Sequence, residues 1–261
     1  MAQLIGDIQI TGSLQNLSFY KMRGSDKIIV RKKGGPTRKQ VKHSPKFENT
    51  RRNNKEFGGR AIAAMYIKSA LHHLMYLADY NITGPLNALL KPIQKLDTVS
   101  EWGKRSIMLS KNPRLLEGFT LNRRYLFESI VRTPVSYSIQ DQQAIIDIPG
   151  LLPGINFMAP GNYPCYQLIA VAGLVPDVFY KDDRFGYLPL NDRYRTNQAF
   201  TDWLPVNKTT AATTLTVSGL PVSKPDDCSI IVAVGIAFGN MQGTEIQPVK
   251  YVGGAKVIGV E

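Results

Sequence analysis

Residues 229–238, SIIVAVGIAF, decide the fold that the sequence predicts. The run contains no charged side chain, and it is apolar at both odd and even positions. Alternate residues of a β-strand point to opposite faces of its sheet. A strand that is apolar on both faces is typical of the middle of a sheet that is covered on both sides. We therefore expect residues 229–238 to form a central strand.

Five further short runs rich in Val, Ile and Thr surround this segment in the sequence, and they span residues 134–139, 144–148, 166–175, 213–220 and 249–260. Turn-forming clusters such as Pro149-Gly150 and Pro160-Gly161 separate them. Several strands at such spacing favour a β-sandwich of immunoglobulin-like or jelly-roll type. We predict an antiparallel β-sandwich domain over residues 123–261.

Helical periodicity precedes the strand-rich half, over residues 60–122. Apolar residues recur every three or four positions from Arg60 to Tyr80, which predicts one helix. A second apolar stripe follows Thr83, and Pro92 is expected to kink or end that helix. A third short helix is expected over residues 100–109. With the strands, this helical layer predicts the α+β class.

A basic segment, residues 18–60 and called the basic arm below, contains fourteen Lys and Arg side chains and three Asp and Glu. The whole chain has a net charge of +12, so the basic arm supplies nearly all of it. Residues 18–22 and 27–33 are expected to pair as a hairpin. Residues 34–36 then break the pattern, and residues 37–54 lack periodicity. We therefore predict a basic hairpin and an extended arm over residues 1–59.

The basic arm is the strongest candidate for an interaction site. Its cations are Arg23, Arg31, Lys32, Lys33, Arg38, Lys39, Lys42, Lys46, Arg51 and Arg52, and its candidate anchors are Phe19, Tyr20, Phe47 and Phe57. Such a segment can lie across a neighbouring subunit and become ordered on assembly. It can also neutralise the phosphates of a nucleic acid, with the aromatic rings stacking on bases. The third alternative is a solvated charged surface without a partner.

The sequence offers little support for an enzyme. It has three histidines, and His72 and His73 are consecutive on a predicted helix, a poor geometry for shared ligation. No nucleophile elbow, phosphate loop or metalloprotease motif is present. Asp182, Asp183 and Asp192 lack regular metal-ligand spacing. We therefore expect no catalytic residues, no metal and no cofactor.

Three stretches of the basic arm resemble a known family: residues 19–21 (FYK), residues 30–36 (VRKKGGP) and residues 50–58 (TRRNNKEFG). Together they are similar to the opening of an uncharacterised protein family associated with Bacteroidota. A weaker similarity covers residues 116–122 (LEGFTLN). The resemblance implies no established activity, cofactor or site residues.

These observations predict a non-enzymatic structural protein that assembles with itself into a homo-oligomer, filament, tube or virion-like particle through its basic arm. Residues 134–261 contain eleven Asp and Glu and eight Lys and Arg, so copies can attract one another head to tail. The alternative is a non-specific nucleic-acid-binding protein.

No apolar run long enough to span a membrane and no secretory signal is apparent, so the sequence predicts a protein that is cytoplasmic or released without a classical signal peptide. Cys165 and Cys228 lie far apart in the sequence, and whether they pair is left open.

Overall fold

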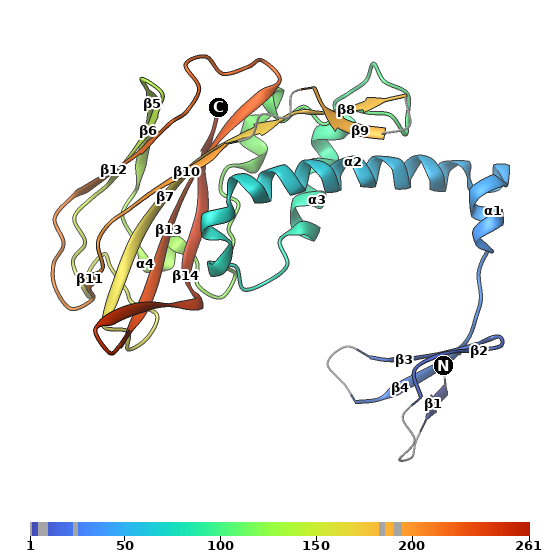
Figure 1. Cartoon of the computed structure of the whole chain (residues 1–261), viewed down its shortest axis with the longest axis horizontal. Helices are drawn as coiled ribbons and strands as arrows, with labels where there is room; N and C mark the ends of the chain where they lie inside the picture. The colour runs from blue at the N-terminus through green and yellow to red at the C-terminus, as the bar shows by residue number, and fades with distance from the viewer. Residues whose placement is uncertain (1, 5–9, 23–25, 183–185, 191–194) are drawn as a thin grey trace. The chain divides into compact units, whose positions relative to one another are not determined.

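A computed structural model describes residues 2–4, 10–22, 26–182, 186–190 and 195–261. The chain divides into two compact units, an N-terminal unit of residues 1–51 and a C-terminal unit of residues 52–261. The division into parts 1–59, 60–122 and 123–261 stays a prediction of the sequence. The structure mixes helices with several antiparallel sheets, which confirms the coarse α+β class (Figure 1).

The N-terminal unit contains a four-stranded antiparallel sheet of order β1-β4-β3-β2, formed by β1 (Ala2–Leu4), β2 (Gly12–Leu14), β3 (Leu17–Lys21) and β4 (Ile28–Lys32). Strands β3 and β4 form the predicted hairpin, in which Phe19 pairs with Val30. Residues 23–25 of the predicted turn lie outside the described residues.

The expectation of an extended path over residues 37–54 is wrong. Helix α1 (Arg38–His43) and the 3-10 helix η1 (Pro45–Phe47) follow the sheet, and α2 (Glu48–Ala70) begins directly afterwards. Thr37 starts α1 with a capping box: its hydroxyl accepts from the Gln40 N–H at 3.2 Å, and its own N–H donates to Gln40 Oε1 at 2.7 Å. Helix α1 buries no residue, so apolar periodicity could not predict it.

Two antiparallel sheets form most of the C-terminal unit. The larger has the order β10-β7-β13-β14, and β11 also pairs with β7. The smaller has the order β12-β6-β5, and β8 pairs with β9 separately. Their bounds are β5 (Ser136–Gln140), β6 (Gln143–Ile148), β7 (Cys165–Pro176), β8 (Val178–Lys181), β9 (Gly186–Pro189), β10 (Thr196–Phe200), β11 (Leu204–Pro205), β12 (Thr213–Ser218), β13 (Cys228–Gln242) and β14 (Glu245–Val260). All six strands expected in this half are present.

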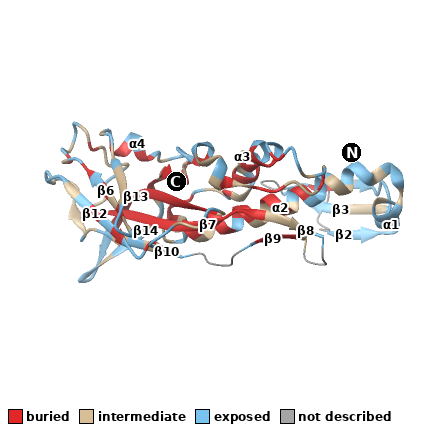
Figure 2. Cartoon of the chain, turned by 90° about the horizontal axis from the view of Figure 1, so that it is seen from above, coloured by how far each residue is buried: buried red, intermediate tan, exposed pale blue. Residues whose placement is uncertain are grey.

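Strands β7 and β13 are buried on both faces, and for β13 the continuous apolar run of residues 229–238 predicted this. Even-numbered residues such as Leu168 and Val232 join the apolar cluster shared with β6 and β12. Odd-numbered residues such as Val171 and Ile231 join a second cluster with α2 and α3. Figure 2 shows buried residues concentrated in β7, β13 and part of α2. The larger sheet therefore lies between the helices and the smaller sheet.

The helical layer consists of α2, the 3-10 helix η2 (His72–Leu77) and α3 (Thr83–Lys95). Glycines of the sheet allow its close approach: an added Cβ at Gly173 would lie 2.8 Å from the Ala70 Cβ, and one at Gly235 would lie 2.6 Å from a Leu74 methyl. The helix predicted after Thr83 is present as α3. The helix predicted from Arg60 to Tyr80 is only partly correct, because α2 begins earlier, at Glu48, and ends at Ala70, where the 3-10 helix η2 takes over. Pro92 lies inside α3, near its end, where little of the helix remains to be interrupted.

The third predicted helix, over residues 100–109, is wrong. That segment is irregular because the Asp97 carboxylate accepts hydrogen bonds from the backbone N–H groups of Val99, Ser100 and Ser106 at 2.8 to 3.1 Å. Three short helices follow, namely η3 (Leu109–Lys111), η4 (Pro113–Leu116) and α4 (Phe127–Ile130).

The two cysteines do not form a disulfide bond in this structure. Cys165 and Cys228 are free and lie at opposite ends of the β7–β13 pair, where they face Gly239 and Pro176 respectively. Among the residues that the structure describes, no helix combines the length and the apolar composition needed to cross a bilayer.

Candidate functional site

The cations predicted to form the interaction site lie mainly on the surface of the N-terminal unit. Seven of them are exposed: Arg31 and Lys32 in β4, Lys33 after it, Arg38, Lys39 and Lys42 on α1, and Lys46 in η1. Arg23 lies outside the described residues. A sheet and helices thus both carry the charge of this unit, where the sequence predicted a hairpin and an extended arm.

Most of these exposed cations are not neutralised within the unit. The Arg31 guanidinium lies 5.3 Å from the centroid of the Tyr20 ring, and the Lys33 ammonium donates to the Gln15 carbonyl at 3.1 Å. Across the described part of the chain, no carboxylate forms an ion pair with Lys32, Lys39 or Lys42, nor with Arg38 or Lys46. Their charge is therefore available to an anionic partner.

Arg51 and Arg52 have structural contacts instead. The Arg51 guanidinium is half-buried and donates hydrogen bonds to the carbonyls of Val41 and Ser44 at 2.9 and 2.8 Å. These two hydrogen bonds connect the end of α1 to the start of α2. The Arg52 guanidinium lies 5.7 Å from the centroid of the Trp102 ring in the C-terminal unit. These two arginines help to build the fold, a role that charge counting could not reveal.

The four candidate anchors differ in exposure and in location. Phe19 in β3 and Phe47 in η1 are half-buried, whereas Tyr20 is exposed. Phe57 lies on α2 within the C-terminal unit and is 56 % exposed. The structure therefore assigns three anchors to the N-terminal unit and one to the other unit.

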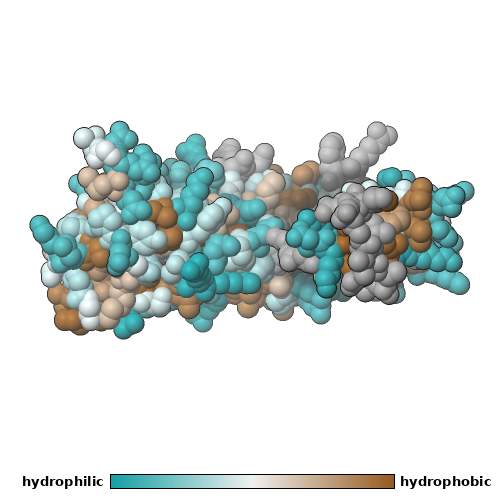
Figure 3. Space-filling model, turned by 90° about the horizontal axis from the view of Figure 1, so that it is seen from below, coloured by the Kyte–Doolittle hydropathy of each residue, from teal (hydrophilic) through white to brown (hydrophobic). Residues whose placement is uncertain are grey.

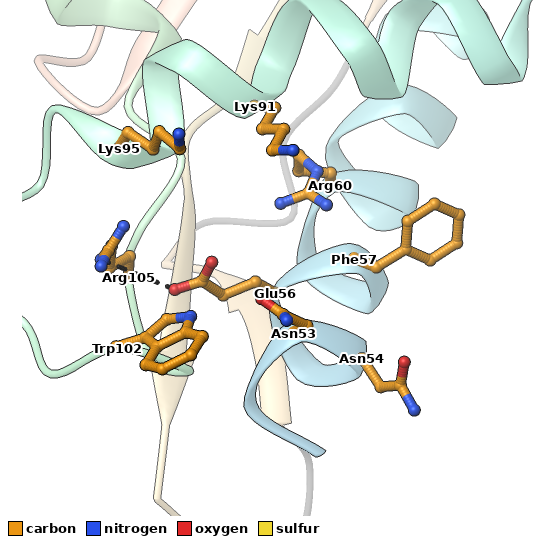
Figure 4. Close-up of a pocket in the computed structure, with 9 residues that line it drawn as sticks. All are labelled: Asn53, Asn54, Glu56, Phe57, Arg60, Lys91, Lys95, Trp102 and Arg105. Atoms are coloured by element: carbon orange, nitrogen blue, oxygen red, sulfur yellow. Dashed lines mark ion pairs between the residues drawn. The ribbon is translucent and has the colours of Figure 1, made fainter. Parts of the chain in front are cut away.

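A second candidate site lies wholly within the C-terminal unit, where a cleft of about 510 Å³ separates the start of α2, the end of α3 and residues 102–105. We call it the cationic cleft, because Arg60, Lys91, Lys95 and Arg105 line it with a single carboxylate, Glu56 (Figure 4). The sequence alone does not reveal it, because these cations come from separate segments. The only sequence signal is the i,i+4 spacing of Glu56 with Arg60 and of Lys91 with Lys95, which places each pair on one helix face.

Arg60 is the least exposed cation of the cleft, at 9 %. Its Nη1 donates to the side-chain oxygen of Gln94, while its Nε is buried without a hydrogen-bond partner among the described residues. Burial lowers the pKa of the Arg60 guanidinium, and the nearby Glu56 carboxylate opposes that shift. The guanidinium keeps its positive charge at neutral pH, because arginine does not deprotonate in proteins.

The remaining polar groups hold the wall of the cleft in place. Glu56 accepts a hydrogen bond from the Gly103 N–H at 2.9 Å, and one of its oxygens lies 3.6 Å from Arg105 Nε. Gln94 donates to the Arg105 carbonyl at 2.9 Å. Lys91 and Lys95 are exposed on α3. Two cations of the cleft are thus fixed, and two are free to adjust to a ligand.

The histidines and aspartates considered as metal ligands lie partly within the described residues. Within the described residues, no group of three or more His, Cys, Asp or Glu side chains is arranged to hold a metal ion. The His72 and His73 rings meet edge to face with centroids 5.5 Å apart. Asp182 pairs with Lys104 at 3.2 Å, whereas Asp183 and Asp192 lie outside the described residues.

Comparisons of this chain with protein-family models, with curated proteins and with solved structures return no match.

Proposed function

We propose that the protein is a structural subunit that assembles with copies of itself through its N-terminal unit. The observation that carries this proposal is the small core of that unit. Among residues 10–22 and 26–51, only Ile28 and Ile29 are buried. A small sheet with so little apolar burial is marginal on its own, so docking on a partner would stabilise it.

Exposed apolar groups of the N-terminal unit support the same proposal. Leu14 in β2 is 64 % exposed, and Met22 after β3 is 46 % exposed. Strand β2 also forms one edge of its sheet, where backbone groups are open to pairing with another chain. The face drawn in Figure 3 is mostly hydrophilic, with separate hydrophobic patches.

The body of the subunit is the C-terminal unit, and we propose that its two sheets form a sandwich of immunoglobulin-like or jelly-roll type. The apolar cluster shared by β6, β7, β12 and β13 supports a sandwich. A basic N-terminal segment attached to such a body resembles the general plan of viral coat proteins, an analogy of architecture alone.

Removal of residues 1–47 tests the assembly proposal. The truncation ends before α2 begins at Glu48, so it leaves the C-terminal unit complete. We expect the full-length protein to form a large species that resists nuclease, and the truncated protein to be a folded monomer. Size exclusion with light scattering and circular dichroism measure both properties. An oligomer that survives the truncation would refute the role of the N-terminal unit.

Point variants test the same surface without a truncation. Leu14→Glu together with Met22→Glu introduces charge at two exposed apolar positions, and we expect the assembly to dissociate at concentrations at which wild type stays assembled. Ile155→Glu is the control, because Ile155 is 71 % exposed in the C-terminal unit. Equal dissociation by the control would mean that any added surface charge disrupts the assembly.

The second candidate function is non-specific binding of nucleic acid, which the exposed cations of β4, α1 and η1 favour. Their binding to generic DNA would release counterions, so the affinity should fall steeply as the salt concentration rises. The measurement is DNA affinity at several salt concentrations, with Arg38→Gln and Lys39→Gln as the variant. A shallow salt dependence, or an affinity that the variant leaves unchanged, would contradict this function.

A further inference from the structure

We propose that the cationic cleft of the C-terminal unit binds a small phosphate-bearing anion with several negative charges, of which pyrophosphate and the phosphate chain of a nucleotide are the simplest examples. This inference goes beyond self-assembly and does not depend on it. The residues that carry it belong to α2, α3 and the segment 102–105, all within one compact unit.

The charge of the lining is the first argument. Four cationic side chains and one carboxylate line the cleft. Glu56 interacts chiefly with one end of the cleft, through the Gly103 N–H and Arg105. In the described chain, no carboxylate pairs with Lys91 or Lys95. The lining therefore has a net charge of +3. A ligand with several negative charges would balance this charge, whereas a ligand with one carboxylate would balance only a third of it.

The buried Arg60 is the second argument. A donor that is removed from water without a hydrogen-bond partner is unfavourable, and more so when it belongs to a charged group. Arg60 Nε is such a donor, since burial removes it from solvent and it has no partner among the described residues. A phosphate oxygen accepts readily from a guanidinium. Arg60 lines the cleft, so a phosphate bound there would balance the charge of a guanidinium whose hydrogen bonds the protein alone leaves incomplete.

The shape and composition of the cleft are the third argument. Its volume of about 510 Å³ falls within the range of small-molecule sites. Figure 4 shows Arg60, Lys91 and Glu56 around a common space, with Arg105 and Trp102 on the other side of it. Two arginines with fixed positions can orient a phosphate, while the two lysines on α3 can adjust to phosphates further along the chain.

Calorimetric titration of the full-length protein with sodium pyrophosphate tests the proposal. The cleft variant is Lys91→Gln with Lys95→Gln, which changes two exposed residues and leaves the fixed groups intact. We expect its dissociation constant for pyrophosphate to rise roughly tenfold or more, the effect of losing two charge-assisted contacts. A second variant, Arg60→Lys, keeps the charge but removes the guanidinium fork, and we expect severalfold weaker binding. Circular dichroism verifies that both variants are folded.

Two double variants that remove the same charge elsewhere are the controls. Lys208→Gln with Lys250→Gln lies on exposed positions of the β-rich part, and Arg38→Gln with Lys39→Gln lies on α1. We expect both to bind pyrophosphate within about twofold of wild type, because the contribution of a distant exposed charge is small. If the α1 variant weakens binding as much as the cleft variant, phosphate binds to the N-terminal surface and the proposal fails.

The choice of ligand distinguishes the sources of phosphate. Inorganic phosphate, ATP, a short single-stranded oligonucleotide and citrate are titrated in parallel. Pyrophosphate or ATP binding more tightly than phosphate and citrate, with loss in the cleft variant, supports the proposal. Citrate binding as tightly as pyrophosphate would refute phosphate selectivity, and binding of the oligonucleotide alone would refute a small-molecule site. Assembly measurements are independent of both results, so failure here leaves the proposed function standing.

Discussion

The Asp97 carboxylate holds residues 99–106 in an ordered loop, where the sequence predicted a helix. Burial alone would raise its pKa, but the hydrogen bonds from Ser106, Ser100 and Val99 outweigh burial and lower the pKa to about 2, from a usual value of 3.8. A carboxyl whose pKa falls on folding stabilises the protein at pH values above its unfolded pKa. That stabilisation is lost as the pH falls through the folded pKa.

Asp97→Asn is therefore expected to lower the free energy of unfolding by about 2 kcal/mol at pH 7, the order of magnitude set by the difference between the two pKa values. The difference between wild type and variant should shrink as the pH decreases from about 4 to about 2. Urea denaturation at a series of pH values measures it. A difference that stays constant over this interval would contradict the role given to the Asp97 charge.

Gly253 occupies a position at which the backbone conformation and the neighbouring strand require glycine. Its φ is +118°, and an added Cβ would lie 2.0 Å from the Ile236 carbonyl oxygen of the neighbouring strand. We expect Gly253→Ala to destabilise the protein by about 3 kcal/mol or more, the size of a severe backbone clash. Thermal denaturation measures the effect.

Gly243→Ala is the matched control for that substitution. Gly243 also has a positive φ, of +65°, but nothing lies within 4 Å of an added Cβ. Its expected cost is about 1 kcal/mol, which reflects backbone strain without a clash. Equal effects at the two glycines would show that the contact with Ile236 is unimportant.

At the element scale, the contact of α2 with β7 depends on a small residue on each element. Because an added Cβ at Gly173 would lie 2.8 Å from the Ala70 Cβ, the helix must move outward to admit any side chain there. We expect Gly173→Ala to cost about 1 to 3 kcal/mol, as overpacking does in other cores. Gly84→Ala, in the first turn of α3 with open space around it, should change the stability by at most about 1 kcal/mol.

Across the whole molecule, we expect the N-terminal unit to unfold locally more readily than the C-terminal unit. Helix α1 buries no residue, whereas α3 buries Leu86, Leu90 and Ile93 although Lys91 and Lys95 are exposed. Limited trypsin digestion at low protein concentration should therefore first produce a fragment that begins between residues 33 and 47 and retains Glu261. Mass spectrometry identifies the fragment. First cleavage after Lys95 would contradict this order.

The rate of trypsin cleavage in α1, measured at several protein concentrations, tests whether copies assemble through the N-terminal unit. If copies associate through the N-terminal unit, the exposed lysines of α1 become shielded as the protein concentration rises. The rate of cleavage at Lys39 and Lys42 should then fall with concentration. A rate that stays constant up to concentrations at which light scattering detects the oligomer would place the contact elsewhere.

How much of this architecture could be predicted depended on whether a segment is buried. Alternation and apolar content predicted six of the strands from residue 134 onward, because their side chains fill the two clusters. The short strands β8, β9, β10 and β11 were not predicted. Helix α1 was missed because hydrogen bonds of Thr37 and Gln40, which leave no apolar pattern, stabilise it. The cationic cleft was missed because residues 34 positions apart, such as Arg60 and Gln94, meet only in the folded chain.

The burial of β7 and β13 on both faces has a consequence for the lengths that this chain can tolerate. Odd and even positions of these strands belong to different surroundings, one helical and one sheet-like. Inserting or deleting a single residue in either strand would exchange every side chain beyond it between the two surroundings, while an insertion of two would preserve their parity. Insertions and deletions of a single residue are therefore expected to be tolerated in the turns, whereas β7 and β13 can change length only by an even number of residues.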